Sequence, residues 1–292
     1  MIRLGKNKKK EKRPFISKLL FVLLFFVLVY LYARYVGTDG ILLKEYNVVD
    51  ENIPSSFDGF TIAHFSDLEY GSTVFIEEVQ NLVDKINEVK PEIVVFTGDL
   101  ISPDYEITSK EQKEVVDALK KLNPLIDTYS VRGDNDISPI YDEIMSECGI
   151  KDISNNYELI YYKGLTPIVL YGLDSNLKGK PDYESAFAYP SPDDDPIHMA
   201  TYRILLLHEP DVIDELKDFN LSLVLSGHSH NSQVNLPYVK DIYNIDGATK
   251  YCDPEYDVGG TKLYISGGLG TEILKMRIFA KPSFNVYRLY TD

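Results

Sequence analysis

The sequence predicts one α/β domain that is attached to a membrane by a single N-terminal helix. Three observations support this fold class. A run of apolar residues near the N-terminus is long enough to span a bilayer. The rest of the 292-residue chain alternates between short apolar runs and amphipathic segments, as α/β domains do. Carboxylates and histidines directly follow several of the apolar runs.

The N-terminal segment has the features of an uncleaved signal anchor. Residues Leu19–Ala33 carry no charge, and the stretch from Phe15 to Val36 would form a helix about 33 Å long. A cleavable signal peptide is the alternative, but no A-x-A-like site surrounds Ala33. Residues 1–18 carry eight Lys or Arg and one Glu. This basic cluster predicts a cytoplasmic N-terminus and a domain on the other side of the cell membrane.

The charge of the chain argues against a nucleic-acid partner. The formal total is −15, and the first 18 residues contribute +7, so the remaining residues carry −22. A domain this acidic repels the phosphate backbone of nucleic acids. We therefore expect the N-terminal helix to provide the contact with the membrane.

The chain divides into three parts by pattern. We expect the basic N-terminus and anchor at 1–36, a linker at 37–58 and the α/β domain at 59–292. The stretch 174–200 is rich in Pro and Asp and predicts a surface loop. Helices are expected at Ser72–Val89, at Glu111–Leu122 and around Ile140–Met145. The expected strands are Thr61–Phe65, Ile93–Thr97, Asp127–Val131, Leu159–Tyr162, Ile168–Tyr171, Arg203–Leu207, Leu221–Ser226, Leu263–Ser266 and Phe284–Leu289.

Five of these strands end at residues that bind metals. In open α/β sheets, the carboxyl ends of the strands form the crevice in which ligands bind. A mixed set of carboxylates and imidazoles at one rim predicts a metal centre, and a neighbouring Gly lets the backbone approach an ion. One such residue is weak support, whereas five in order are strong. They are Asp67 and Glu69, then Asp99 after Gly98, then Asp134-Asn135-Asp136 after Gly133, then His208, and then His228 and His230 after Gly227.

These motifs resemble the calcineurin-like metallophosphoesterases, whose pattern is D-x-H, G-D, G-N-H-D/E, H and G-H-x-H. The strings HEPD, SGHSH and LYISGGLG resemble a membrane-anchored subgroup of bacterial phosphodiesterases. The resemblance implies an αββα sandwich of two mixed sheets flanked by helices, with two divalent ions at the rim. It implies that one ion is held by Asp67, Glu69, Asp99 and His230, and the other by Asp99, Asp134, His208 and His228. Such a pair, about 3.5–4 Å apart, generates a hydroxide and stabilises phosphate oxygens.

Three positions depart from the family pattern. Glu69 stands where the family has His, and Asp134 where it has Asn, although Asn135 is an alternative ligand in a shifted register. The added negative charge favours harder ions such as Mn²⁺ or Mg²⁺ over Zn²⁺. We expect Mn²⁺ or Fe as the pair of ions, with Zn²⁺ or Mg²⁺ as alternatives. Asn135 occupies the place of the family's catalytic His and cannot donate a proton to a leaving group. Asp136 and Tyr70 are candidates to substitute for it.

The function implied is that of a metal-dependent phosphoesterase with reduced general-acid capacity, acting as a phosphodiesterase on lipid or cell-envelope phosphoesters. Asp99, as the bridging ligand, and Asn135 would carry the catalysis. The alternative is a metal-binding pseudoenzyme that serves as an envelope binding or scaffold module, which the absence of His at positions 69 and 135 favours. Arg277 is a further candidate for contact with a substrate phosphate.

Overall fold

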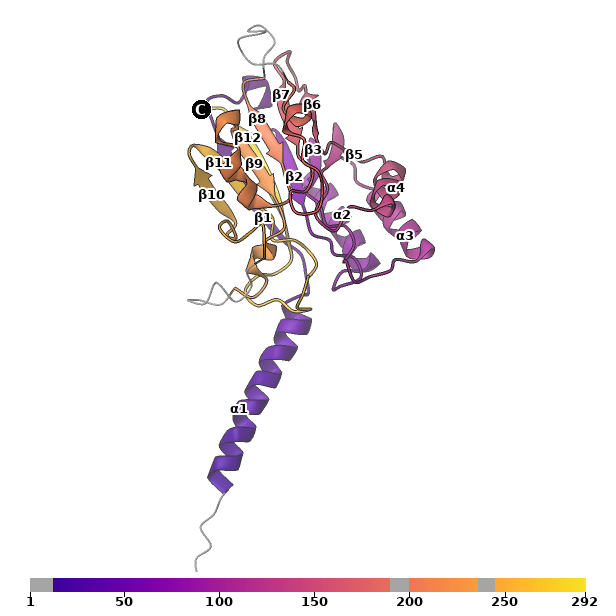
Figure 1. Cartoon of the computed structure of the whole chain (residues 1–292), viewed down its shortest axis with the longest axis vertical. Helices are drawn as coiled ribbons and strands as arrows, with labels where there is room; N and C mark the ends of the chain where they lie inside the picture. Colours follow the sequence, from indigo (N-terminus) through magenta and orange to yellow (C-terminus); the bar gives the residue numbers. More distant parts are fainter. Residues whose placement is uncertain (1–12, 190–199, 236–244) are drawn as a thin grey trace, which may run out of the picture.

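Two six-stranded mixed sheets pack face to face in the computed structural model, which describes residues 13–189, 200–235 and 245–292 (Figure 1). In the first sheet the strand order is β1 (Leu42–Val49), β12 (Ser283–Tyr290), β2 (Thr61–Phe65), β3 (Ile93–Phe96), β4 (Asp127–Ser130) and β5 (Lys151–Asp152). In the second sheet it is β10 (Glu255–Val258), β11 (Thr261–Ile265), β9 (Leu223–Ser226), β8 (Arg203–Leu206), β7 (Ile168–Gly172) and β6 (Asn156–Ile160).

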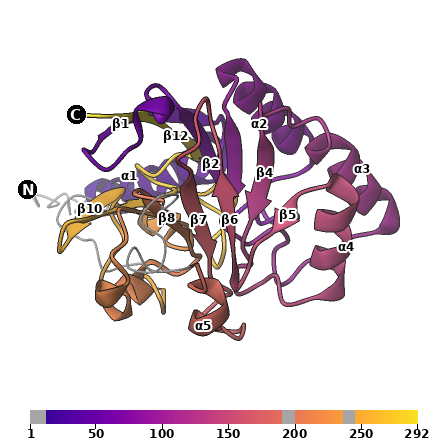
Figure 2. The same ribbon diagram turned by 90° about the horizontal axis from the view of Figure 1, so that it is seen from above.

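Helices cover the outer faces of both sheets. Helices α2 (Ile76–Val89), α3 (Ser109–Leu119) and α4 (Pro139–Cys148) lie against the first sheet (Figure 2). The short helix α5 (Tyr183–Ala186) and the 3₁₀ turns Pro210–Glu215 and Lys217–Phe219 lie on the second. The expected αββα sandwich is therefore confirmed.

Local sequence signals set the helix boundaries. Helix α3 begins after Thr108, whose hydroxyl accepts a hydrogen bond from the Glu111 backbone N–H, while the Glu111 carboxylate accepts one from the Thr108 N–H. Helix α4 begins after Ser138 with Pro139 in its first turn, and ends at Gly149, which has a φ of 71°. These caps satisfy backbone groups that would otherwise be left without partners.

The buried strands of the two sheets form the core between the layers. Strands β2, β3, β7 and β9 are buried at every residue, so they lack the polar alternation of a half-exposed strand. Burial of each large aliphatic side chain here contributes roughly 1.5–3 kcal/mol. This central layer fixes the strand ends on which the candidate site is built.

Residues 37–58, which the sequence analysis treats as a linker, contain a strand of the domain. Strand β1 pairs in parallel with β12 over eight residues, and Val48 is buried in the core between the sheets. The alternation along β1 is weak because it is an edge strand with only one neighbour, and most of its side chains are at least partly exposed. The two-residue strand β5 and the edge strand β10 were also not expected from the sequence.

The N-terminal helix α1 (Arg13–Leu31) continues into a π-helical turn at Tyr32–Val36 and projects away from the sandwich (Figure 1). The stretch Ile16–Val36 is long and apolar enough to cross a membrane, and only 6% of it is buried. Its last turn contacts the domain, because the Ala33 carbonyl accepts a hydrogen bond of 2.9 Å from the Arg277 N–H. Ala33 is completely buried there.

Candidate metal centre

The candidate ligands lie in loops that follow the strands β2, β3, β4, β8 and β9. Five of them have a backbone φ between 46° and 66°, which non-glycine residues rarely adopt: Asp67, Glu69, Asp99, His228 and His230. Such a conformation costs of order 1 kcal/mol or more for each residue and persists where the surroundings enforce it. This concentration of backbone strain in one set of loops is typical of a functional site.

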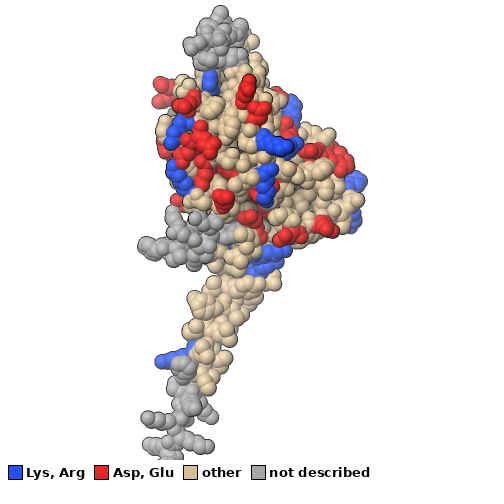
Figure 3. All heavy atoms as spheres, viewed as in Figure 1, with Lys and Arg blue, Asp and Glu red and all other residues tan. Residues whose placement is uncertain are grey.

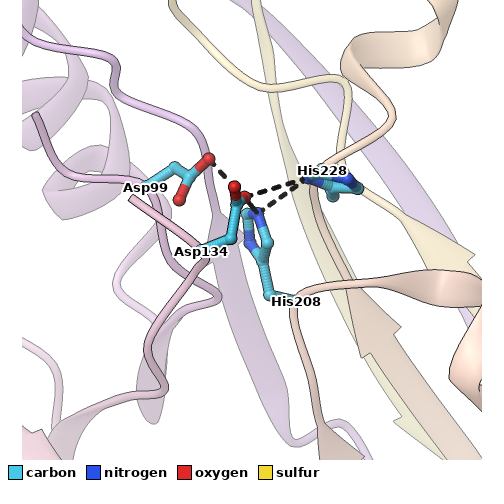
Figure 4. A group of neighbouring side chains, drawn as sticks. All are labelled: Asp99, Asp134, His208 and His228. Carbon is cyan, nitrogen blue, oxygen red and sulfur yellow. Dashed lines mark hydrogen bonds and ion pairs between the residues drawn. The ribbon is translucent and has the colours of Figure 1, made fainter. Parts of the chain in front are cut away.

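Asp99, Asp134, His208 and His228 form one compact cluster (Figure 4). One ligand atom from each residue lies within 4.8 Å of those of the others, and all four side chains are buried. His208 Nε2 is 3.3 Å from Asp99 Oδ2 and 3.5 Å from Asp134 Oδ1. His228 Nδ1 is 3.5 Å from Asp134 Oδ1 and 3.1 Å from His208 Nε2. This set has the donors and the spacing of a site for one metal ion.

Backbone carbonyls orient the two imidazoles of this cluster. His208 Nδ1 lies 2.6 Å from the Thr97 carbonyl, and His228 Nε2 lies 2.7 Å from the Asp246 carbonyl. Because a carbonyl only accepts, each of these nitrogens carries a proton, so in the neutral imidazole the other ring nitrogen would present a lone pair to a bound cation. The same arrangement orients histidines that bind metals in other proteins.

Asp67, Glu69 and His230 lie beside this cluster. His230 Nε2 is 3.6 Å from Asp67 Oδ1, and His208 Nε2 is 4.0 Å from the same oxygen. The Asn135 amide donates hydrogen bonds of 3.1 Å to Glu69 Oε1 and 3.0 Å to Asp99 Oδ2. The structure thus brings all seven predicted ligands to one rim, with Asp99 between the two groups.

Glycines allow the loops to approach this closely. A Cβ at Gly98 would lie 2.3 Å from the Gly133 nitrogen, and one at Gly133 would lie 2.2 Å from Asp99 Oδ1. A Cβ at Gly270 would lie 2.3 Å from the Cβ of Glu69. A Cβ at Gly268 would lie 2.8 Å from the Cβ of Asp67, so Gly268 and Gly270 belong to the wall of the site.

Burial and mutual repulsion shift the pKa values of the carboxylates. Burial raises the pKa of Asp67 to about 6. Burial, followed by the charges of Asp99 and Asp67, raises the pKa of Glu69 well above its ordinary value. Burial also opposes ionisation of Asp134, but the neighbouring His208 imidazole, followed by Lys178, outweighs it and lowers the Asp134 pKa. Without a bound cation, the buried site cannot keep all of its carboxylates ionised at low cost in free energy.

The hydrogen bonding of these carboxylates also fits a metal centre. Glu69 Oε2 and Asp134 Oδ1 are buried oxygens without a hydrogen-bond partner among the described residues. An unpartnered buried carboxylate oxygen costs several kcal/mol, which a bound cation would offset. Four carboxylates and three imidazoles supply enough donors for two ions that share Asp99.

Lys178 is a site residue that the sequence analysis missed. Its ammonium lies 2.7 Å from Asp134 Oδ2 and donates a hydrogen bond of 3.1 Å to Asn135 Oδ1. Glu209, the buried neighbour of His208, accepts hydrogen bonds from the Ser175 hydroxyl and the Asn176 N–H, and these hold the Lys178 loop in place. The expected surface loop gave no signal for this role, and its residues 190–199, with His198, lie outside the described part of the chain.

Neither candidate substitute for the catalytic His faces the site. Asp136 is buried and accepts hydrogen bonds from the backbone N–H groups of Asp99, Leu100 and Gly133, so it holds two ligand loops together. Burial raises the pKa of Tyr70 to about 12, and its ring packs on Phe75 and Tyr105. These two residues are structural in this arrangement.

Arg277 is not positioned to contact a substrate. It is completely buried, and its guanidinium donates hydrogen bonds to the backbone carbonyls of Gly267, Gly270 and Ala280. Nη2 also lies 3.4 Å from His230 Nδ1. Arg277 therefore supports the loop that carries His230. His64 is likewise a core residue, bonded to Thr97 and Tyr287, and burial lowers its pKa to about 3.

Two packed sheets with a rim of buried Asp, Glu and His residues form an α/β domain with a candidate metal site at one edge. The family model for the calcineurin-like phosphoesterases matches residues 60–232. The chain belongs to this family.

Three relatives illustrate the range of the family. The uncharacterized metallophosphoesterase YkuE of Bacillus subtilis is 32% identical over 265 residues, which are 89% of each chain. The UDP-2,3-diacylglucosamine pyrophosphatase LpxG of Chlamydia muridarum is 22% identical, covering 90% of this chain and 93% of its own. The phosphodiesterase YaeI of Escherichia coli is 22% identical, covering 79% and 82%.

Proposed function

We propose that the protein is a metal-dependent phosphodiesterase that hydrolyses lipid or cell-envelope phosphoesters with a dinuclear metal centre. The observation that carries this proposal is the convergence of seven buried metal-type ligands, each from a loop at the carboxyl end of a strand. Membership of the phosphoesterase family supports the reaction type. A purely structural cluster would not leave Glu69 Oε2 and Asp134 Oδ1 unpartnered.

In this proposal Asp67, Glu69, Asp99 and His230 hold one ion, and Asp99, Asp134, His208 and His228 hold the other. Asp134 is favoured over Asn135 as the ligand, because Asp134 Oδ1 faces His208 and His228 while the Asn135 amide donates to Glu69 and Asp99. When bound, the two ions supply a hydroxide nucleophile and positive charge for the phosphate oxygens.

The ligand set favours hard ions. Four carboxylates outnumber three imidazoles, and the Glu69 oxygens replace a neutral donor of the family pattern. Carboxylate oxygens suit Mn²⁺ and Fe²⁺ better than they suit Zn²⁺. We propose Mn²⁺ or Fe as the working metal.

Lys178 takes over part of the role of the family's catalytic His. Asn135 can orient a phosphate by hydrogen bonding but cannot donate a proton to a leaving alkoxide. The Lys178 ammonium, 3.1 Å from Asn135 Oδ1, adds a positive charge beside that amide. We propose that it contacts a phosphoryl oxygen of the substrate and stabilises the negative charge there. This arrangement suits aryl or other good leaving groups better than alkyl groups.

The N-terminal helix and the relatives support an envelope substrate. By the positive-inside rule, the basic N-terminus favours a single-pass membrane protein whose domain lies outside the cytoplasm, and we propose this topology. LpxG is named for a pyrophosphate substrate that carries acyl chains, and YaeI is named a phosphodiesterase. We propose that the substrate is likewise a phosphoester of a lipid or wall polymer.

The test uses the full chain in detergent, stripped of metal and reloaded with Mn²⁺. Hydrolysis of bis(p-nitrophenyl) phosphate is expected for the wild type, together with about two Mn²⁺ per chain by elemental analysis. Asp99→Asn is expected to lose the activity and at least one ion, because Asp99 is the shared ligand. Bound metal without turnover would instead identify a pseudoenzyme that acts as a binding or scaffold module. Failure to bind divalent ions would refute both readings.

A further inference from the structure

The candidate metal centre and the end of the membrane helix lie at the same edge of the sandwich. Strand β1 starts at this edge, directly after α1, and runs parallel to β12 and therefore antiparallel to β2. The carboxyl end of β2, which leads to Asp67, is thus at the start of β1, two strands across the sheet. At about 4.8 Å per strand, that separation is about 10 Å.

The second sheet has the same polarity. Strand β11 ends at this edge, since the loop that follows it leads to the start of β12, and β9 and β8 run parallel to β11. The loops after β8 and β9, which carry His208, His228 and His230, therefore also lie on the side from which α1 leaves the domain. The apolar stretch Ile16–Val36 is about 31 Å long as a helix, which equals the thickness of the hydrocarbon core of a bilayer. Its last residue is then at headgroup level.

An exposed apolar surface flanks the end of α1. The membrane-proximal loop, residues 271–281, exposes 74% of Ile273 and 70% of Phe279, and it also exposes Lys275 and Lys281. Lys and Arg side chains gather where α1 meets the domain (Figure 3). Apolar side chains beside cations, next to a transmembrane helix, are typical of a surface that rests in a bilayer interface.

This loop is tied both to the anchor and to the ligands. Arg277 donates its backbone N–H to the Ala33 carbonyl, and a Cβ at Gly37 would lie 1.9 Å from the Arg277 carbonyl, so helix and loop are in close contact. The Arg277 guanidinium donates to the His230 carbonyl at 3.4 Å. The Ile278 N–H donates to the Gln233 carbonyl at 2.9 Å, three residues after His230. The domain therefore cannot rotate freely about the end of α1.

We propose that the membrane-proximal loop inserts Ile273 and Phe279 into the bilayer interface, so that the metal centre faces the leaflet in which α1 ends. The substrate is then a phosphoester on the headgroup of a membrane-embedded amphiphile, rather than a soluble ester or a distant wall polymer. The substrate class rests on the proposed function, whereas the contact with the bilayer does not.

The contact is tested with tryptophan fluorescence, because the chain contains no Trp. Phe279→Trp places a single reporter in the membrane-proximal loop. Leu165→Trp is the matched control, since Leu165 is 84% exposed in the turn between β6 and β7, at the opposite edge of the second sheet. Both full-length variants are reconstituted in phosphatidylcholine vesicles with or without brominated acyl chains. Strong quenching is expected at position 279 and little at 165. Equal or no quenching at 279 would overturn the bilayer contact.

The substrate class is tested with two esters that share one leaving group. One is bis(p-nitrophenyl) phosphate in solution, and the other is the p-nitrophenyl phosphodiester of a dialkylglycerol in the same vesicles. Wild-type protein is expected to favour the lipid ester at least tenfold in kcat/KM. Ile273→Asp is expected to remove that preference without changing turnover of the soluble ester, whereas Leu165→Asp changes neither. Hydrolysis of the soluble ester without this preference would refute the substrate class alone, and no hydrolysis of either would refute the proposed function.

Discussion

The role of Lys178 gives the sharpest test of the chemistry at the site. In Lys178→Met the charge is removed and most of the aliphatic stem is kept. A charge-assisted hydrogen bond contributes roughly 1.5–3 kcal/mol, which corresponds to about 10–100-fold in rate. The Lys178 side chain is 55% exposed, so solvent screening favours the lower end of that range. We expect kcat/KM for bis(p-nitrophenyl) phosphate to fall about tenfold.

Controls separate a contact with substrate from an effect on the metal. Lys178 also pairs with Asp134 Oδ2, a proposed ligand, so the assay is run at saturating Mn²⁺ with the metal content measured for each variant. Lys178→Arg keeps the charge and should retain most of the activity. Lys180→Met removes an exposed lysine two residues further along the same loop and should act as wild type. If Lys178→Met stays within twofold of wild type at equal metal content, Lys178 does not contact the reacting phosphate.

Three further predictions concern the departures from the family pattern. Asn135→His restores a proton donor, so turnover of alkyl phosphodiesters should rise by about 10²–10⁴-fold and that of aryl esters much less. Equal gains for both esters in steady-state assays would count against this. Glu69→His should move the metal preference from Mn²⁺ or Fe towards Zn²⁺, measured as the activity of protein stripped of metal and reloaded with each ion. If the ions support activity in the same order as in the wild type, Glu69 does not select the metal. The pKa of Glu69 is higher in the folded state than in the unfolded state, whose value is 4.5. Ionisation of Glu69 therefore lowers the free energy of unfolding of the metal-free protein as the pH rises above 4.5. Glu69→Gln should therefore melt at a higher temperature than wild type at pH 8 but not at about pH 4, in EDTA; no pH dependence of this difference would contradict the burial argument.

Local sequence patterns predicted most of the helices and strands of the fold. Buried strands such as β2 and β7 are short, mostly apolar runs; Ser66 follows the first and Gly172 ends the second, and α2 has a clear apolar face. Edge strands gave no comparable pattern, since β1 and β10 each have one neighbour and remain partly exposed. The pattern along β1 therefore predicts only a linker, although that strand brings the N-terminal helix beside the candidate site.

The order of the motifs located the seven candidate ligands, because the carboxyl ends of parallel strands meet at one edge whatever the details of packing. Side chains recruited by loop geometry could not be found in that way. Lys178 reaches the site because Glu209 folds its loop inward, and Arg277 turns away from substrate because backbone carbonyls saturate its guanidinium. Neither residue has a spacing or a neighbour in the sequence that distinguishes it from a surface cation.

The sequence by itself determined the α/β class, the apolar N-terminal helix and the set of candidate metal ligands, because each depends on residue type and on periodicity along the chain. The tertiary structure alone decided which loops converge behind those residues, which cation lies beside Asp134 and Asn135, and on which side of the sandwich the N-terminal apolar helix leaves (Figure 1). These features depend on contacts between residues more than a hundred positions apart, such as Ala33 with Arg277 and Asp67 with His230. No local pattern encodes them, since only the packing of the two sheets brings those residues together.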